Sequence, residues 1–125
     1  MCIRDRKMPL CADANCGLTL DTARRYIDGT RKAKLMFVEQ PLAYDDIDGL
    51  KKLTKASKVP VGIDEGIHSI ADIETNAKAG ASGVSLKLIK LGGITGALEA
   101  AKLCQKLGLS VNLSLIHISE PTRPY

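Results

Sequence analysis

Short apolar runs that each end in a charged residue recur along this chain at an interval of about 25 residues. The charged residues are Asp13, Glu39, Asp64 and Lys87, and the successive gaps are 26, 25 and 23 residues. One strand and one returning helix take up about that length of chain. Each charged residue therefore falls at the end of a strand in a repeated strand–helix unit. Chemistry in such folds collects at the carboxyl ends of the strands, so the four positions are candidates for one shared site.

The strands are predicted from the apolar runs themselves. The chain contains one Phe, three Tyr and no Trp, so its core must be built from Ile, Leu, Val and Ala, which suits buried parallel strands. The strands are expected over 10–13, 35–38, 59–63 and 83–86, and a fifth is expected to begin at 110.

Helices are predicted between the strands, where apolar residues recur at spacings of three and four. Thr19 and Ser69 are candidate N-caps, and Gly80 and Gly108 are candidate ends. The positions expected to face the sheet are Leu20, Ala23 and Ile27, then Ile47, Leu50 and Leu53, then Ile70, Ile73 and Ala77, and finally Leu98, Ala101 and Leu107.

Strands that alternate with helices predict an α/β fold with a parallel sheet and right-handed crossovers. The choice lies between an open doubly wound sheet and a (β/α)₈ barrel of the TIM type. Barrels draw catalytic residues from several strand ends, so the series of three acids and one amine favours the barrel. About four strand–helix units and one strand make a partial barrel, roughly half of one.

Composition argues against several classes of protein. Of 125 residues, 45% are hydrophobic and 26% charged, and the net charge is +4, which is ordinary for a globular domain. Few aromatic residues and no dense basic stripe argue against nucleic-acid binding. No apolar run reaches the length of a membrane span. Cys11, Cys16 and Cys104 form no C-x-x-C pair, which favours reduced thiols and a cytoplasmic location over a zinc site or disulfides.

The two ends of the chain can be encoded by inverted copies of one DNA string. The codons ATG TGT ATA AGA GAC encode Met1 to Asp5, and AG begins the codon of Arg6. The reverse complement, CTG TCT CTT ATA CAC AT, encodes Leu113 to His117 and begins the codon of Ile118. We interpret both ends as a sequencing-library transposon adapter read through as protein.

Residues 1–6 and 113–125 are therefore expected to be derived from the adapter, with 119–123 as its continuation. Residues 7–112 are expected to be the biological domain, an internal piece of a longer protein. The alternative is a native basic N-terminus and a native polar tail.

The three carboxylates of Asp13, Glu39 and Asp64 would lie on consecutive strand ends. Adjacent strands are about 4.8 Å apart, so the three acids would span about 10 Å and could meet around one ion. All-oxygen ligands suit a hard cation such as Mg²⁺. Lys87, one strand beyond, could remove a proton from the carbon next to a metal-held carboxylate. A single acid at a strand end is more often a helix cap or a surface charge, and Lys87 alone would read as a solvated loop residue.

Four further residues are candidates for supporting roles or for substrate binding. Gln40 and Glu65 adjoin the predicted ligands, although either could simply bond to local backbone. Asn15 could reach a substrate or stabilise its own turn, and Lys90 is the competing amine. His68 reads as a solvated loop residue. Gly92 and Gly93 at a helix start could bind an anion or form a plain turn.

Four motifs follow one another in order: DANCG at 13–17, FVEQP at 37–41, IDE at 63–65 and KLIKLGGI at 87–94. Together they resemble the C-terminal barrel of the enolase superfamily, in its mandelate racemase/muconate lactonizing enzyme branch. This resemblance implies that the three acids bind Mg²⁺ and that Lys87 is the acid/base at the end of the sixth barrel strand.

A Lys at that strand is similar to the muconate lactonizing subgroup, which implies racemase or epimerase, dehydratase or cycloisomerase chemistry. The implied partner is a small carboxylate, an amino-acid-like compound or a hydroxy acid, and the parent protein is expected to be a homo-oligomer. GIHS at 66–69 with SLKLIKLGG at 85–93 looks most like the cis-3-hydroxy-L-proline dehydratases.

The chain departs from the family by what it lacks: the capping domain, the second-strand Lys-x-Lys motif and the last two barrel strands. Without the cap, water is not excluded from the site. Two other functions therefore stay open. The polypeptide could be a non-catalytic half-barrel with at most weak cation binding, or a phosphate-binding barrel that uses Gly92 and Gly93.

Overall fold

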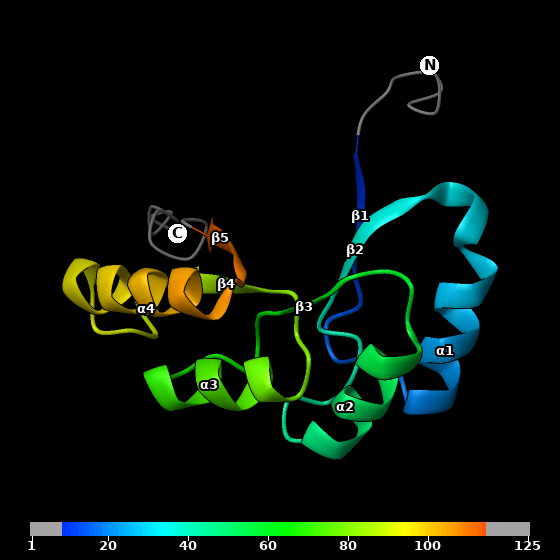
Figure 1. The fold of residues 1–125 in the computed structure, drawn as a ribbon, viewed down its shortest axis with the longest axis horizontal. Coiled ribbons are helices and arrows are strands. Elements are labelled where there is room, and N and C mark those ends of the chain that lie inside the picture. The colour runs from blue at the N-terminus through cyan, green and yellow to red at the C-terminus, as the bar shows by residue number, and fades with distance from the viewer. Residues whose placement is uncertain (1–8, 115–125) are drawn as a thin grey trace, which may run out of the picture.

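The computed structural model describes residues 9–114, with side chains to residue 113, and folds them into a half-barrel (Figure 1). Five parallel strands lie in the order β1-β2-β3-β4-β5, each joined to the next by a helical crossover. The four α-helices follow one another along one side of the curved sheet. The predicted α/β half-barrel is thereby confirmed.

The elements are β1 (Leu10–Asp13), α1 (Leu20–Gly29), the 3₁₀ helix η2 (Arg31–Ala33), β2 (Leu35–Glu39), α2 (Ile47–Ala56), β3 (Val61–Ile63), α3 (Ile70–Lys78), β4 (Gly83–Lys87), α4 (Ile94–Leu107) and β5 (Ser110–Ser114).

Alternation along the strands divides the sheet into a helix-covered face and an open face. The helix-covered face is apolar and buried, and it packs against the inner sides of the helices. Its strand residues are Val38, Val61, Ile63, Val84 and Leu86, and the helix residues in the same core include Ala23, Ile27, Leu50, Leu53, Ile73, Ala100 and Cys104.

The open face carries the residues between them. Asp13 is the register partner of Glu39, and Glu39 is that of Gly62. A hollow on this face is lined by Phe37, Glu39, Gly62, Gly83 and Ser85, among other residues. Apolar side chains, among them Met36 and Val111, line the same hollow, so polar and apolar groups share the open face.

Local signals in the sequence fix where the helices begin and end. Thr19 and Thr22 form a reciprocal capping box at the start of α1. Ser69 caps α3 by accepting from the Asp72 N–H. Gly108 ends α4 at φ +70°, in the left-handed region that glycine enters at little cost.

The structure departs from the predicted helix faces in α3 and α4. In α3, Ile70 is 38% exposed at the first helical position, and Asn76 is buried instead. In α4, Leu98 and Leu107 are exposed. The buried face of α4 carries small residues, namely Ala97, Ala100 and Cys104.

The third strand is shorter than predicted and begins at Val61 rather than Val59. The Ser57 hydroxyl donates to the Val59 carbonyl at 2.6 Å and accepts from the Val59 N–H at 3.0 Å, which closes a local turn. Pro60 has no N–H to offer a neighbouring strand, so regular pairing starts after it.

At the C-terminal side, β5 continues to Ser114, two residues beyond the boundary expected at 112. Most of the expected adapter segments, 1–6 and 113–125, lie outside the described residues, so their origin stays a prediction. Within the part of the chain that the structure describes, no helix is both long and apolar enough to cross a membrane.

Candidate active site

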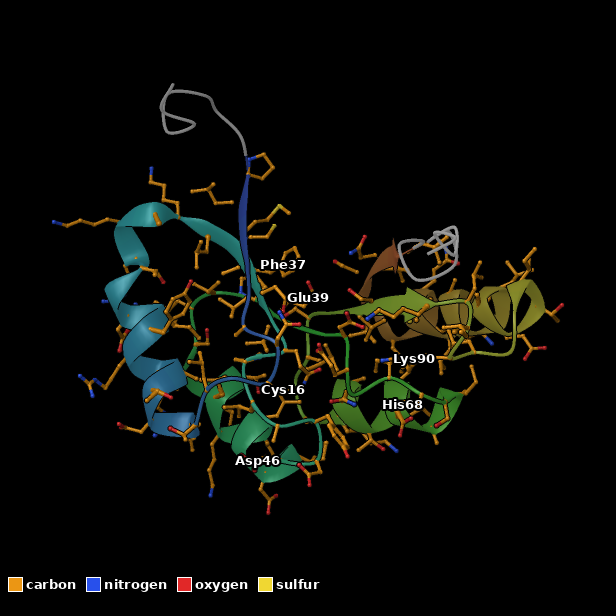
Figure 2. All side chains as sticks on the ribbon, turned by 180° about the vertical axis from the view of Figure 1, so that it is seen from behind. Cys16, Phe37, Glu39, Asp46, His68 and Lys90 are labelled. Atoms are coloured by element: carbon orange, nitrogen blue, oxygen red, sulfur yellow. The ribbon has the colours of Figure 1, made fainter. Side chains whose placement is uncertain are left out.

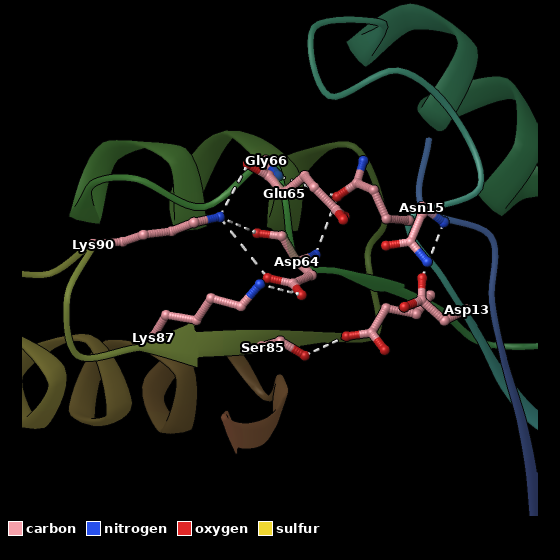
Figure 3. Close-up of polar contacts among 10 residues, drawn as sticks. Asp13, Asn15, Asp64, Glu65, Gly66, Ser85, Lys87 and Lys90 are labelled. Carbon is pink, nitrogen blue, oxygen red and sulfur yellow. Dashed lines mark hydrogen bonds and ion pairs between the residues drawn. The ribbon is translucent and has the colours of Figure 1, made fainter. Parts of the chain in front are cut away.

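The four charged residues that end the apolar runs lie at one edge of the sheet. Figure 3 shows three of them, Asp13, Asp64 and Lys87. Asp13, Glu39 and Lys87 are the last residues of β1, β2 and β4, and Asp64 follows β3 directly. The parallel order of the strands brings these ends side by side. The chain thus places three carboxylates and one amine along a single rim.

Asp64 and Lys87 form the closest charged contact of the rim. Lys87 Nζ lies 2.7 Å from Asp64 Oδ2, and the two side chains are only 12% and 15% exposed, respectively. A charge-assisted contact of this length, partly shielded from water, is stronger than a surface ion pair. The amine therefore reaches across to the acid of the neighbouring strand.

Glu39 is held from β4, on the other side of β3. The Ser85 hydroxyl donates a short hydrogen bond to Glu39 Oε1, and Ser85 is only 5% exposed. Gly62, the residue of β3 beside Glu39, has no side chain to intervene. The spacing of the charged residues did not point to Ser85. Its position two residues before Lys87, hence on the same face of β4, was the signal that could have found it.

Gln40, a predicted supporting residue, is 3% exposed and bonded at both ends of its amide. Its Oε1 accepts from the backbone N–H groups of Asp64 and Gly66, both at 3.1 Å. Its Nε2 donates to the Leu42 carbonyl at 3.0 Å. The backbone of Gln40 lies at φ +34°, which is unusual for a residue with a side chain.

Lys90, the competing amine, lies mainly against backbone. Its Nζ contacts the carbonyl oxygens of Asp64 at 3.4 Å and Glu65 at 3.5 Å. The nearest carboxylate oxygen, Asp64 Oδ1, is 3.9 Å away. Of the two lysines, Lys87 is thus the one in close contact with the acid.

The β1 end of the rim is more exposed, and Cys16 lies in the turn that follows β1 (Figure 2). Asp13 is exposed, and its Oδ1 accepts from the backbone N–H of Asn15 at 3.0 Å. Asn15 and Cys16 both have positive φ, at +44° and +59°, in the turn that follows. The contact shown for Asn15 is thus the one that stabilises its own turn.

The pKa of the Cys16 thiol is affected by acids from two strand ends. Burial raises the pKa of the Cys16 thiol, and the negative charges of Glu65, Asp13 and Asp64 raise it further. The backbone N–H of Tyr44 opposes this by donating to the sulfur, which lowers the pKa. Carboxylates that end β1 and that follow β3 therefore both affect the pKa of the Cys16 thiol.

The donor chemistry of the rim fits a hard cation. Asp64 Oδ1 and Glu65 Oε2 are buried oxygens without a hydrogen-bond partner, which is costly unless a cation or water satisfies them. Carboxylate oxygens are also the ligands that Mg²⁺ prefers. Within residues 9–113, however, no three acidic, His or Cys side chains converge closely enough to hold an ion. The assignment of Asp13, Glu39 and Asp64 as ligands stays a prediction.

Two other candidates can be placed. His68 is exposed, as expected for a loop residue, and its ring meets the edge of Tyr44 at a centroid distance of 6.2 Å. Gly92 and Gly93 have φ of +73° and +96°, and the Gly93 N–H donates to the Leu88 carbonyl at 2.8 Å. That N–H is thus used within the turn, which favours the plain turn over the phosphate site.

Comparison with known proteins decides the family. Residues 3–121 match the family model described as enolase C-terminal domain-like. The chain belongs to this family. The superfamily resemblance read from the four motifs is thereby confirmed, whereas the closer likeness to the cis-3-hydroxy-L-proline dehydratases stays a prediction.

Among the curated relatives, a hydrophobic dipeptide epimerase of Roseobacter litoralis is 37% identical over 100 residues, which cover 80% of this chain and 29% of that protein. Among solved structures, the substrate-liganded L-Ala-D/L-Glu epimerase of Bacillus subtilis is 30% identical, with a TM-score of 0.79 over 85% of this chain and 30% of that one.

An L-talarate/galactarate dehydratase mutant, solved with Mg and L-glucarate, is 27% identical, with a TM-score of 0.80 over 88% of this chain and 28% of that one. The chain thus spans less than a third of each of these relatives.

Proposed function

We propose that this chain is part of a Mg²⁺-dependent enzyme that removes the proton next to the carboxylate of a small organic acid. The rim supports this, because it combines three strand-end acids with one amine. The names of the relatives support it as well, since they include epimerases and a dehydratase, and one was solved with Mg. Epimerisation, β-elimination of water and cycloisomerisation all begin with loss of such a proton.

In this proposal Asp13, Glu39 and Asp64 hold the ion. Bound Mg²⁺ would supply positive charge beside the substrate carboxylate, where negative charge develops as the proton leaves. The chain itself positions two of the acids: Ser85 directs Glu39, and Gln40 holds the backbone of Asp64.

Lys87 is the proposed acid/base. Its Nζ would take the proton as the neutral amine and, as the ammonium, return it or pass it on, from one face of the substrate. The single observation that carries this role is the contact of Lys87 Nζ with Asp64 Oδ2 at 2.7 Å, which places the amine beside a predicted ligand. The proposed substrate is an amino-acid-like compound or a hydroxy acid.

The test is Lys87→Ala in the intact enzyme that contains this segment. We expect turnover to fall by about 10²- to 10⁴-fold, the usual contribution of a general acid/base, while Mg²⁺ binding is retained. Turnover at the wild-type level would refute the role. That the intact protein is a cytoplasmic homo-oligomer is a separate proposal, checked by light scattering and cell fractionation.

A second candidate concerns the polypeptide as it stands. It could be a non-catalytic half-barrel with at most weak cation binding. Among residues 9–113 no three acidic, His or Cys side chains form a group that could hold an ion, which favours this for the isolated chain. Purified 125-residue chain should be assayed with epimerase and dehydratase substrates, and turnover that depends on Mg²⁺ would exclude the inert alternative.

A further inference from the structure

We infer that Gln40 and Lys90 are a pair of positioning residues that clamp the segment Asp64–Gly66 from its two sides and so fix the direction of the Asp64 carboxylate. The segment lies directly after β3 at the rim (Figure 3). Gln40 follows β2 on one side, and Lys90 lies in the loop after β4 on the other. The consequence for Mg²⁺ binding rests on the proposed function, whereas the clamp itself does not.

Gln40 accepts hydrogen bonds from N–H groups of the segment. A side-chain carbonyl oxygen has two lone pairs, and those of Gln40 Oε1 accept from Asp64 N–H and Gly66 N–H, both at 3.1 Å. The amide cannot rotate away, because Nε2 is held by the Leu42 carbonyl. With Gln40 buried, loss of this side chain would leave the two N–H groups without that partner.

Lys90 contacts the carbonyl groups of the same segment. An ammonium has three N–H donors, and Lys90 Nζ lies among three oxygens: Asp64 O at 3.4 Å, Glu65 O at 3.5 Å and Asp64 Oδ1 at 3.9 Å. These contacts are long, so the attraction is mainly that of a charge for the surrounding dipoles. The Lys90 side chain is 21% exposed, which leaves that attraction only partly screened.

The two residues of the clamp contact complementary groups. Gln40 accepts from backbone N–H groups and Lys90 donates to backbone carbonyls, so neither residue can replace the other. Asp64 is the residue common to both. Lys87 then meets a carboxylate whose backbone is already fixed from β2 and from the loop after β4. Lys90 is accordingly a positioning residue, and Lys87 is the amine that exchanges protons.

The clamp is tested first without metal, by amide hydrogen exchange in the intact enzyme. We expect the Asp64 and Gly66 amides to exchange at least tenfold faster in Gln40→Leu. Should the Gln40→Leu protein fail to fold, the wild type itself provides the test, because its Asp64 and Gly66 amides should then exchange slowly. Unchanged exchange in a folded Gln40→Leu protein, or fast exchange of both amides in the wild type, would overturn the clamp.

The second arm compares Lys90→Met, which keeps the aliphatic stem, with Lys78→Met at an exposed position of α3 as the matched control. We expect Lys90→Met to weaken Mg²⁺ binding about 10- to 100-fold. Turnover should recover at saturating Mg²⁺ with an unchanged pH profile of kcat. Lys78→Met should change neither quantity.

The outcomes separate the clamp from the proposed function. Turnover that stays lost at saturating Mg²⁺, or loss of one limb of the pH profile, would make Lys90 a proton carrier and overturn the positioning role. Unchanged Mg²⁺ affinity in Lys90→Met would overturn it as well. A wild-type enzyme that needs no Mg²⁺ but shows the expected exchange rates would refute the proposed function and leave the clamp standing.

Discussion

The helix-covered face and the open face of the sheet use alternate residues of the same strands, but they do different work. On the helix-covered face, Val38, Ile63 and Leu86 are buried among helix side chains. On the open face, Glu39 and Ser85 are paired with each other. Apolar burial supplies most of the favourable free energy of folding, so stability resides on one face and the proposed chemistry on the other.

The largest expected effect contrasts the two faces directly. Leu53, on α2, is 1% exposed, and Leu53→Ala should lower the free energy of unfolding by about 2–5 kcal/mol. Phe37 lines the hollow of the open face, so Phe37→Ala should cost only about 1 kcal/mol. Urea unfolding of the two variants measures both values. An equal loss in the two would show that the open face also carries the core.

A smaller effect contrasts two acids within the open face. Asp64→Asn leaves the Lys87 ammonium without its carboxylate, so we expect a loss of about 2 kcal/mol, below the 3–5 kcal/mol typical of fully buried pairs. Asp13→Asn keeps an oxygen that can accept from the Asn15 N–H, so the change should stay within about 0.5 kcal/mol.

Metal-free thermal or urea unfolding checks this pair of variants. If Asp13→Asn were as costly as Asp64→Asn, the β1 end of the rim would be as strongly organised as its centre, contrary to its exposure.

The smallest effect lies at the start of α3 and depends on pH. Burial alone would raise the pKa of Asp72, but hydrogen bonds from the Ser69 hydroxyl and from the His68 and Ser69 N–H groups outweigh it and lower that pKa below its usual 3.8. A carboxyl whose pKa is lower in the folded state stabilises the fold above its unfolded pKa, and loses that stabilisation as pH falls through the folded value.

Wild-type chain should therefore be more stable than Asp72→Asn at pH 7, by less than the roughly 1 kcal/mol expected for the cap variant Ser69→Ala. The difference should shrink as the pH falls below the usual carboxyl pKa of 3.8. Urea unfolding at pH 7, 4 and 3 measures it, and a difference that grew with acidification would contradict the assigned sign.

Much of the fold was predictable because the signals are local. Apolar runs, caps such as Ser69 and the helix end at Gly108 depend on residues close together in sequence. The packing faces of α3 and α4 were not predictable in this way. Small residues, Ala97, Ala100 and Cys104, are buried in α4 because a close approach to the sheet matters more there than hydrophobicity.

The candidate site was likewise predictable only in part. The strand-end position of Asp13, Glu39, Asp64 and Lys87 followed from their spacing. The contacts made by Ser85 and Lys90 depend on which strands lie side by side and on the reach of each side chain, and spacing alone does not provide that information.

Mg²⁺ titration of the intact enzyme, with Asp13→Asn, Glu39→Gln and Asp64→Asn beside the wild type, tests the central claim most directly. We expect one tight site in the wild type and loss of that site in each of the three variants, with binding retained in Lys87→Ala. Wild-type affinity in any of the three acid variants would remove that residue from the metal site. Wild-type affinity in all three would show that the rim is not a Mg²⁺ site.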